Sequence, residues 1–118
     1  MITPLKLAFI GYNEEQTQRY FDEFRWMNRD QVEAYTRVFG KILLNDGTII
    51  QRAPATKEKL DGLRFDQIIV ACDRRGYGVW PSYQRELLYA LEQRMTCGRV
   101  PAEYGVIYYD LDSEEDKS

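Results

Sequence analysis

The chain has 118 residues, of which 44% are hydrophobic and 14% aromatic, with 16 basic residues, 19 acidic residues and no histidine. This length and apolar content indicate one folded domain and exclude a disordered chain. Because histidine is absent, the commonest general base and the commonest metal ligand are missing, so neither a catalytic triad nor a zinc site is expected.

The first predicted elements are a strand and a helix. Residues 5–12 (LKLAFIGY) form a short apolar run that is typical of a buried strand. Asn13 is a helix-capping residue type, and Gln16 stands where a capping box needs its second member. The helix is predicted to end near Met27, with an apolar face formed by Thr17, Tyr20, Phe21, Phe24 and Met27.

Two further elements are predicted in the middle of the chain. The spacing of Val32, Tyr35 and Phe39 predicts a short helix over residues 30–39, although residues 35–39 also fit a strand. Residues 41–53 (KILLNDGTIIQRA) predict a β-hairpin, because their central Asp-Gly pair supplies the positive φ angles of a tight turn.

A buried strand, a helix and a last strand follow. Residues 65–72 (FDQIIVAC) are predicted as the strand and residues 103–109 as the last strand. Pro81 opens a helix that is predicted to run to about Thr96. The apolar face of that helix is predicted to comprise Tyr83, Leu87, Leu88, Leu91 and Met95.

These elements predict an α/β fold, a three-layer sandwich with a mostly parallel sheet and an edge β-hairpin. The strands at 5–12, 66–72 and 104–109 are separated by helices, and right-handed crossovers would make them parallel. We expect a single domain over residues 1–109 and a disordered acidic tail over 110–118. No apolar run approaches the roughly 18 residues needed to cross a bilayer, and we expect a cytoplasmic protein with no membrane partner.

Asp73 is the first candidate site residue, since it directly follows the apolar run that ends at Cys72. A carboxylate at the carboxyl end of a buried strand holds magnesium in nucleotide hydrolases. The alternative is that Asp73 caps the turn that follows, which aspartate favours in many loops.

Residues 5–97 resemble the middle of a P-loop ATPase core of the phage large-terminase and helicase-like type. The resemblance lies in a strand–helix unit, a hairpin with a D-G turn and a G-x-R-x-D approach at Gly62, Arg64 and Asp66. That approach leads to a strand from Ile68 to Asp73 that is similar to Walker B. The resemblance implies a motor-like fold of phage or mobile-element origin.

The same comparison shows which catalytic groups are missing. No G-x-x-x-x-G-K-[ST] motif occurs, since Gly40-Lys41 is followed by Ile42, and the phosphate cradle is therefore absent. The position of the family's catalytic glutamate is occupied by Arg74. We therefore expect neither ATP hydrolysis nor a bound cofactor.

An arginine- and aromatic-rich segment follows Asp73. Guanidinium and aromatic groups can grip phosphates and stack bases, and they are equally typical of protein–protein contacts. The sequence therefore predicts a non-catalytic binding protein, an inhibitor or an assembly or accessory factor, with a protein or nucleoprotein partner and with nucleic acid as a possible ligand. The predicted binding residues are Arg74, Arg75, Tyr77, Trp80 and Arg85.

Both tryptophans allow two interpretations. An exposed Trp26 on the polar side of the first helix would mark a partner surface. Alternatively, Trp26 and Trp80 fill the edges of the core.

An enzyme is the alternative to the binding protein. Asp73 could converge with Asp110 and Asp112 to hold Mg²⁺ for processing of nucleotides or nucleic acid. The D-x-D pair faintly resembles Toprim-type nuclease domains, although the glycines of their motifs are absent. The competing interpretation is that Asp112 belongs to a solvated acidic tail.

Overall fold

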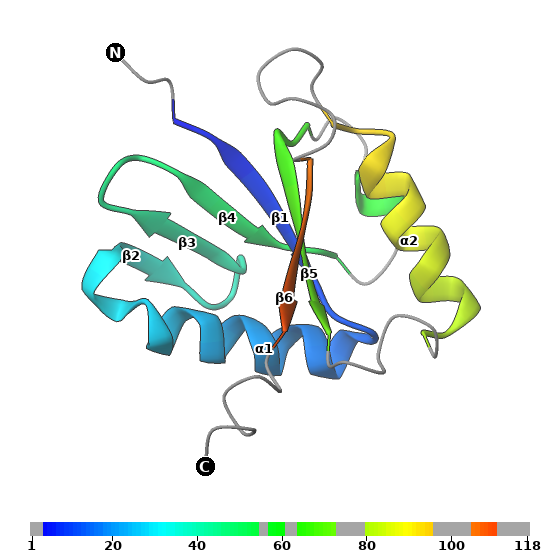
Figure 1. Ribbon diagram of the computed structural model, residues 1–118, viewed down its shortest axis with the longest axis horizontal. Coiled ribbons are helices and arrows are strands. Elements are labelled where there is room, and N and C mark those ends of the chain that lie inside the picture. Colours follow the sequence, from blue (N-terminus) through cyan, green and yellow to red (C-terminus); the bar gives the residue numbers. More distant parts are fainter. Residues whose placement is uncertain (1–3, 55–56, 61–63, 73–79, 96–104, 111–118) are drawn as a thin grey trace.

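Hydrophobic strands in the first and second halves of the chain join one six-stranded sheet, in the order β2-β3-β4-β1-β5-β6 (Figure 1). This computed structural model describes residues 4–54, 57–60, 64–72, 80–95 and 105–110. The strands are β1 (Lys6–Ile10), β2 (Val32–Thr36), β3 (Lys41–Leu44), β4 (Ile49–Arg52), β5 (Gln67–Cys72) and β6 (Val106–Asp110). The helices are α1 (Glu14–Met27) and α2 (Ser82–Glu92), with the short 3-10 helices η1 (Arg29–Gln31) and η2 (Lys57–Leu60).

The pairing of the strands confirms the predicted mixed sheet. β1 lies between β4 and β5 and is parallel to both, and β5 is parallel to β6. β2, β3 and β4 are antiparallel neighbours and form one side of the sheet. The helices α1 and α2 cover opposite faces, so the three-layer sandwich is confirmed (Figure 1).

The start of α1 is fixed by its predicted cap. The Asn13 side-chain oxygen accepts a hydrogen bond of 2.7 Å from the backbone N–H of Gln16, and the helix ends at Met27 as predicted. The reciprocal half of a capping box does not form, because the buried Oε1 of Gln16 has no hydrogen-bond partner. Thr17 and Phe21 are the buried residues of α1, whereas Met27 is exposed.

The predicted helix over residues 30–39 is wrong, because this segment forms η1 and the strand β2. β2 pairs with β3, and the register shifts between Val32 and Ala34, which leaves Glu33 as an extra residue in a β-bulge. The bulge brings Val32 and Tyr35 to the same side of the sheet, where both pack on the α1 layer. Their spacing of three therefore imitates a helix inside a strand.

The β3–β4 hairpin forms where the sequence predicts it. Gly47 adopts φ +91°, and the Asp46 carboxylate accepts a 2.9 Å hydrogen bond from the N–H of Thr48. That hydrogen bond lowers the pKa of Asp46 below its ordinary value. Of the Asp-Gly pair only Gly47 has the predicted positive φ, whereas Asp46 contributes its hydrogen bond to the backbone.

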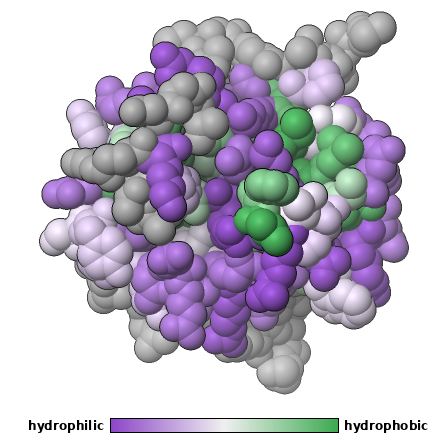
Figure 2. Space-filling model, turned by 180° about the vertical axis from the view of Figure 1, so that it is seen from behind, coloured by the Kyte–Doolittle hydropathy of each residue, from purple (hydrophilic) through white to green (hydrophobic). Residues whose placement is uncertain are grey.

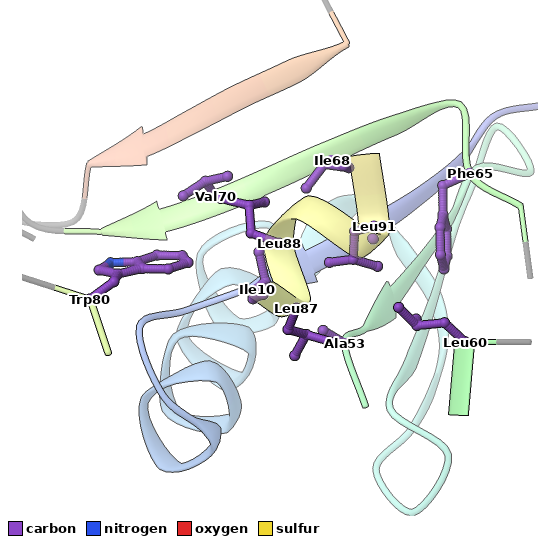
Figure 3. Packing of buried hydrophobic residues seen from close by; sticks show 11 residues of the cluster. Ile10, Ala53, Leu60, Phe65, Ile68, Val70, Trp80, Leu87, Leu88 and Leu91 are labelled. Atoms are coloured by element: carbon purple, nitrogen blue, oxygen red, sulfur yellow. The ribbon is translucent and has the colours of Figure 1, made fainter. Parts of the chain in front are cut away.

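Two apolar layers fill the space between the sheet and its helices. Side chains alternate along β1, so that Phe9 packs under α1 while Ala8 and Ile10 pack under α2. Leu87, Leu88 and Leu91 of α2 are buried as predicted (Figure 3). Tyr83 is not, because Gln84 faces the sheet in its place and Tyr83 is exposed.

The ends of the last two elements differ from their predicted bounds. α2 ends at Glu92 rather than near Thr96, and its chain continues into turn hydrogen bonds from Arg94 and Met95 to the helix. β6 includes Asp110, which lies in register with Cys72 of β5. None of the described helices is long and apolar enough to span a membrane.

Candidate functional site

Four parallel strands end at one edge of the sheet. β1, β4, β5 and β6 run in the same direction, so their last residues Ile10, Arg52, Cys72 and Asp110 lie at the same edge. From this edge the chain enters α1 on one face after β1 and reaches α2 on the other face after β5 (Figure 1). Open α/β sheets bind ligands at such an edge, where the connections diverge to opposite faces.

A groove of about 1200 Å³ opens at this edge, and we call it the edge groove. It combines the start of α1, the β2–β3 turn, the end of β4, η2 and the start of α2. Its lining residues are Asn13, Glu14, Glu15, Gln18, Arg19, Asp22, Glu23, Arg37, Phe39, Arg52, Ala53, Pro54, Lys59 and Tyr83.

The two sides of the edge groove carry opposite charge. The α1 side presents four carboxylates, interrupted by Arg19. The other side presents Arg37, Arg52 and Lys59, and no acid lines it among the described residues. No ion pair within the described part of the chain neutralises these three cations. The groove therefore offers a ligand both signs of charge, separated across its width.

Arg52 is held in place by the β2–β3 turn. Its backbone N–H donates a 2.7 Å hydrogen bond to the carbonyl of Gly40, whose φ is +62°. A Cβ atom at Gly40 would lie 2.9 Å from the Cβ and 3.0 Å from the Nε of Arg52. Glycine at position 40 therefore serves both the turn and the close approach of the arginine side chain.

Asp22 on the α1 side belongs to a hydrogen-bonded cluster. Its Oδ1 accepts a 2.7 Å hydrogen bond from the Tyr35 hydroxyl and a 3.0 Å bond from the Gln18 amide. The Arg25 guanidinium lies 4.3 Å from the centre of the Tyr35 ring. Burial, and then the hydrogen bond to Asp22, raise the pKa of Tyr35 above its ordinary value.

This shift predicts an alkaline loss of stability. The folded-state pKa of Tyr35 exceeds the unfolded value of about 10. The stability that the neutral Tyr35 hydroxyl contributes is therefore fully present below that pH, and it is lost as the pH rises through the folded-state pKa. Denaturant midpoints from pH 8 upward should therefore fall more steeply for the wild type than for Tyr35→Phe. Tyr89→Phe, which changes an exposed tyrosine, should retain the wild-type slope. Equal slopes for Tyr35→Phe and wild type would contradict the assignment.

A buried polar link ties both helices to the end of β1. The N–H of Gly11 donates to Thr17 Oγ1 at 2.8 Å, and the Gln84 amide donates to the carbonyl of Gly11 at 2.8 Å. A Cβ at Gly11 would lie 3.0 Å from the backbone of Thr17, so glycine permits α1 to approach the strand. This link fixes the α1 side of the edge groove.

Of the predicted binding residues, the structure describes Trp80 and Arg85. Asp73, Arg74, Arg75 and Tyr77 lie outside the described residues. Trp80 is only 2% exposed and belongs to the α2 layer, where its ring points into the apolar cluster (Figure 3). Arg85 is exposed on α2 and lines a separate hollow together with Glu86 and Tyr89.

Trp26 agrees with the interpretation in which its side chain is exposed on the first helix rather than packed at the edge of the core. Its side chain is exposed at the end of α1, where the Arg29 guanidinium lies 4.3 Å from its ring centre. The face shown in Figure 2 is mostly hydrophilic where it is coloured, with a few apolar patches.

The carboxylates proposed for Mg²⁺ are described only in part. The backbone register of Cys72 with Asp110 brings the ends of β5 and β6 together, while Asp73 and Asp112 lie outside the described residues. Within the described residues, no group of three or more His, Cys, Asp or Glu side chains could hold a metal ion.

Asp66, the last residue of the G-x-R-x-D match, lies at the opposite edge of the sheet. Its buried carboxylate accepts a 2.9 Å hydrogen bond from the N–H of Lys6, and its own N–H donates to the carbonyl of Lys6 at 2.7 Å. Asp66 therefore joins the starts of β5 and β1, which is a structural role.

Sequence reasoning missed the cations of the edge groove and Phe39. Their positions depend on β4 running parallel to β1, which places Arg52 at the carboxyl edge. The signal available in the sequence was the position of Arg52 at the end of the predicted hairpin, two residues before Pro54.

No protein family, curated protein or solved structure matches the chain. The resemblance to P-loop ATPase cores remains a prediction from the sequence.

Proposed function

We propose that this protein is a non-catalytic binding protein whose edge groove holds a segment of a protein partner. The observation that carries the proposal is the opposite charge of the two sides of the groove. Arg37, Arg52 and Lys59 offer donors to carboxylates, and the acids of α1 offer acceptors to lysine or arginine.

This charge pattern favours a polypeptide over a nucleic acid. A nucleic-acid backbone carries charge of one sign, and the carboxylates along α1 would repel it. A protein segment can present both signs at the required separation, and Phe39 and Tyr83 add aromatic contacts that are typical of interfaces.

The sequence resemblance extends this proposal to the origin and the kind of binding protein. A motor-like fold that lacks the phosphate cradle and the catalytic glutamate suits an inhibitor or an assembly factor of phage or mobile-element origin. Arg74, Arg75 and Tyr77 are proposed to contribute to the same partner contact.

Site-directed photo-crosslinking tests the proposal. A benzoylphenylalanine at position 83 lies in the edge groove, whereas one at position 89 lies on α2 outside it, and the two tyrosines have matched exposure of 59% and 63%. In cells of the native host, position 83 should yield a protein adduct that position 89 does not. The charge reversal Arg37→Glu with Arg52→Glu should abolish this adduct.

Three outcomes would contradict the proposal. They are equal adducts from both positions, an adduct that survives the charge reversal, and an adduct that nuclease digests but protease does not.

The magnesium-dependent enzyme is kept as a second candidate because the β5–β6 register brings Cys72 and Asp110 side by side. A binding protein should show no Mg²⁺-dependent rise in melting temperature and no turnover of ATP, DNA or RNA. A rise that Asp73→Asn or Asp110→Asn abolishes would favour the enzyme instead.

A further inference from the structure

The turn between β2 and β3, residues 37–40, carries two adjacent apolar side chains in water. Val38 is 83% exposed and Phe39 is 71% exposed, the two largest values among the exposed large hydrophobics of the described chain. Turns favour small and polar residues, and neither side chain fills the core. Their exposure therefore serves neither the turn nor the fold.

The turn is held in a fixed shape. The N–H of Gly40 donates a 3.1 Å hydrogen bond to the carbonyl of Arg37, and the N–H of Arg52 donates a 2.7 Å bond to the carbonyl of Gly40. A bonded turn loses little conformational entropy when it binds, so its apolar side chains are ready-made contact points.

Cations surround this apolar pair. Arg37 and Lys41, which flank Val38, Phe39 and Gly40 in the chain, are exposed, and the Arg52 side chain lies against Gly40. Residues 37–41 contain no acid, and no ion pair within the described chain neutralises these cations. A partner surface that complements this turn therefore combines apolar side chains with carboxylates.

We propose that the turn binds a segment of the partner protein in which apolar side chains are flanked by acidic ones. The apolar side chains pack on Val38 and Phe39, and the carboxylates bind Arg37, Lys41 and Arg52. This inference rests on the proposed protein-binding function and adds the chemistry of the partner segment.

A membrane with anionic lipids has a related chemistry, but the observations favour the protein segment. Phe39 lines the edge groove, and the α1 side of this groove presents carboxylates that would face the lipid phosphates. The experiment must therefore distinguish binding to lipid vesicles from binding to a peptide.

Fluorescence anisotropy with labelled, capped hexapeptides tests the inference on the full chain. The peptide EELLEE should bind the wild type at least about tenfold more tightly than KKLLKK or EESSEE at low salt, and added salt should weaken its binding. The double variant Val38→Ser with Phe39→Ser should lose this preference, and so should Arg37→Glu. Both variants change exposed side chains, and circular dichroism should confirm that they fold.

The matched control is Trp26→Ser. Trp26 is 62% exposed and stacks with a guanidinium, as an aromatic ring beside a cation at another site. This variant should bind EELLEE as the wild type does. Equal binding of the three peptides, or an equal loss in the Trp26 variant, would overturn the inference.

Vesicles of phosphatidylserine and phosphatidylcholine form the last arm. Binding to these vesicles that requires Val38 and Phe39, without a preference for EELLEE, would also overturn it. The crosslinking experiment at positions 83 and 89 is independent of the peptides. A groove adduct without peptide preference would refute only this inference, whereas loss of the adduct would refute the proposed function.

Discussion

Replacing Phe9 by alanine should lower the free energy of unfolding by about 3–5 kcal/mol. Phe9 is fully buried in β1, the strand between β4 and β5. The centre of its ring lies 5.4 Å from that of Phe21, in an edge-on arrangement, and 5.6 Å from that of Phe24. Alanine would remove these contacts and leave a cavity under α1 that a central strand cannot close.

Equilibrium denaturation with urea measures this change. Ile107→Ala on the edge strand β6 is the control, because its partly exposed side chain should contribute less than about 1 kcal/mol. A loss for Phe9→Ala as small as that of the control would show that the α1 layer is not packed around this ring.

Thr17→Val should lower the free energy of unfolding by about 1–3 kcal/mol. The Thr17 hydroxyl accepts a hydrogen bond from Gly11 and donates one of 2.6 Å to the carbonyl of Asn13. Valine keeps the shape of threonine but leaves the buried N–H of Gly11 without a partner. The loss should therefore come from the unsatisfied polar group and not from a cavity.

Thr36→Val is the matched control, since Thr36 is exposed on the edge strand β2. Its unfolding midpoint in urea should stay close to that of the wild type. An equally small effect of Thr17→Val would mean that the link between β1 and α1 does not stabilise the fold.

Local sequence signals predict the elements whose stability is local. The Asn13 cap and the Asp46-Gly47 turn act within a few residues, and both elements form as predicted. The bulge at Glu33 gives β2 the spacing of a helix, and only the pairing of β2 with β3 identifies it as a strand. Gln84 was missed because its partner, the carbonyl of Gly11, is remote in sequence.

The candidate site could be predicted less well, because it depends on contacts between remote segments. Arg37 and Arg52 share a groove with α1 only because β4 lies beside β1 in the same direction. The residue type of Trp80 leaves binding and core packing open, and its burial beside α2 agrees with the second interpretation. The prediction that the carboxyl edge of the sheet carries the site could be made from topology alone.

The bulge at Glu33 also limits how another chain can attach to this end of the molecule. β2 is the outermost strand, and an edge strand with free backbone groups would accept an added strand from any polypeptide, largely regardless of its sequence. The bulge interrupts the regular spacing of the N–H and C=O groups on the outer edge of β2, and the exposed Glu33 adds a charge there. We therefore expect a partner that approaches from this side to recognise side chains rather than to add a strand to the sheet.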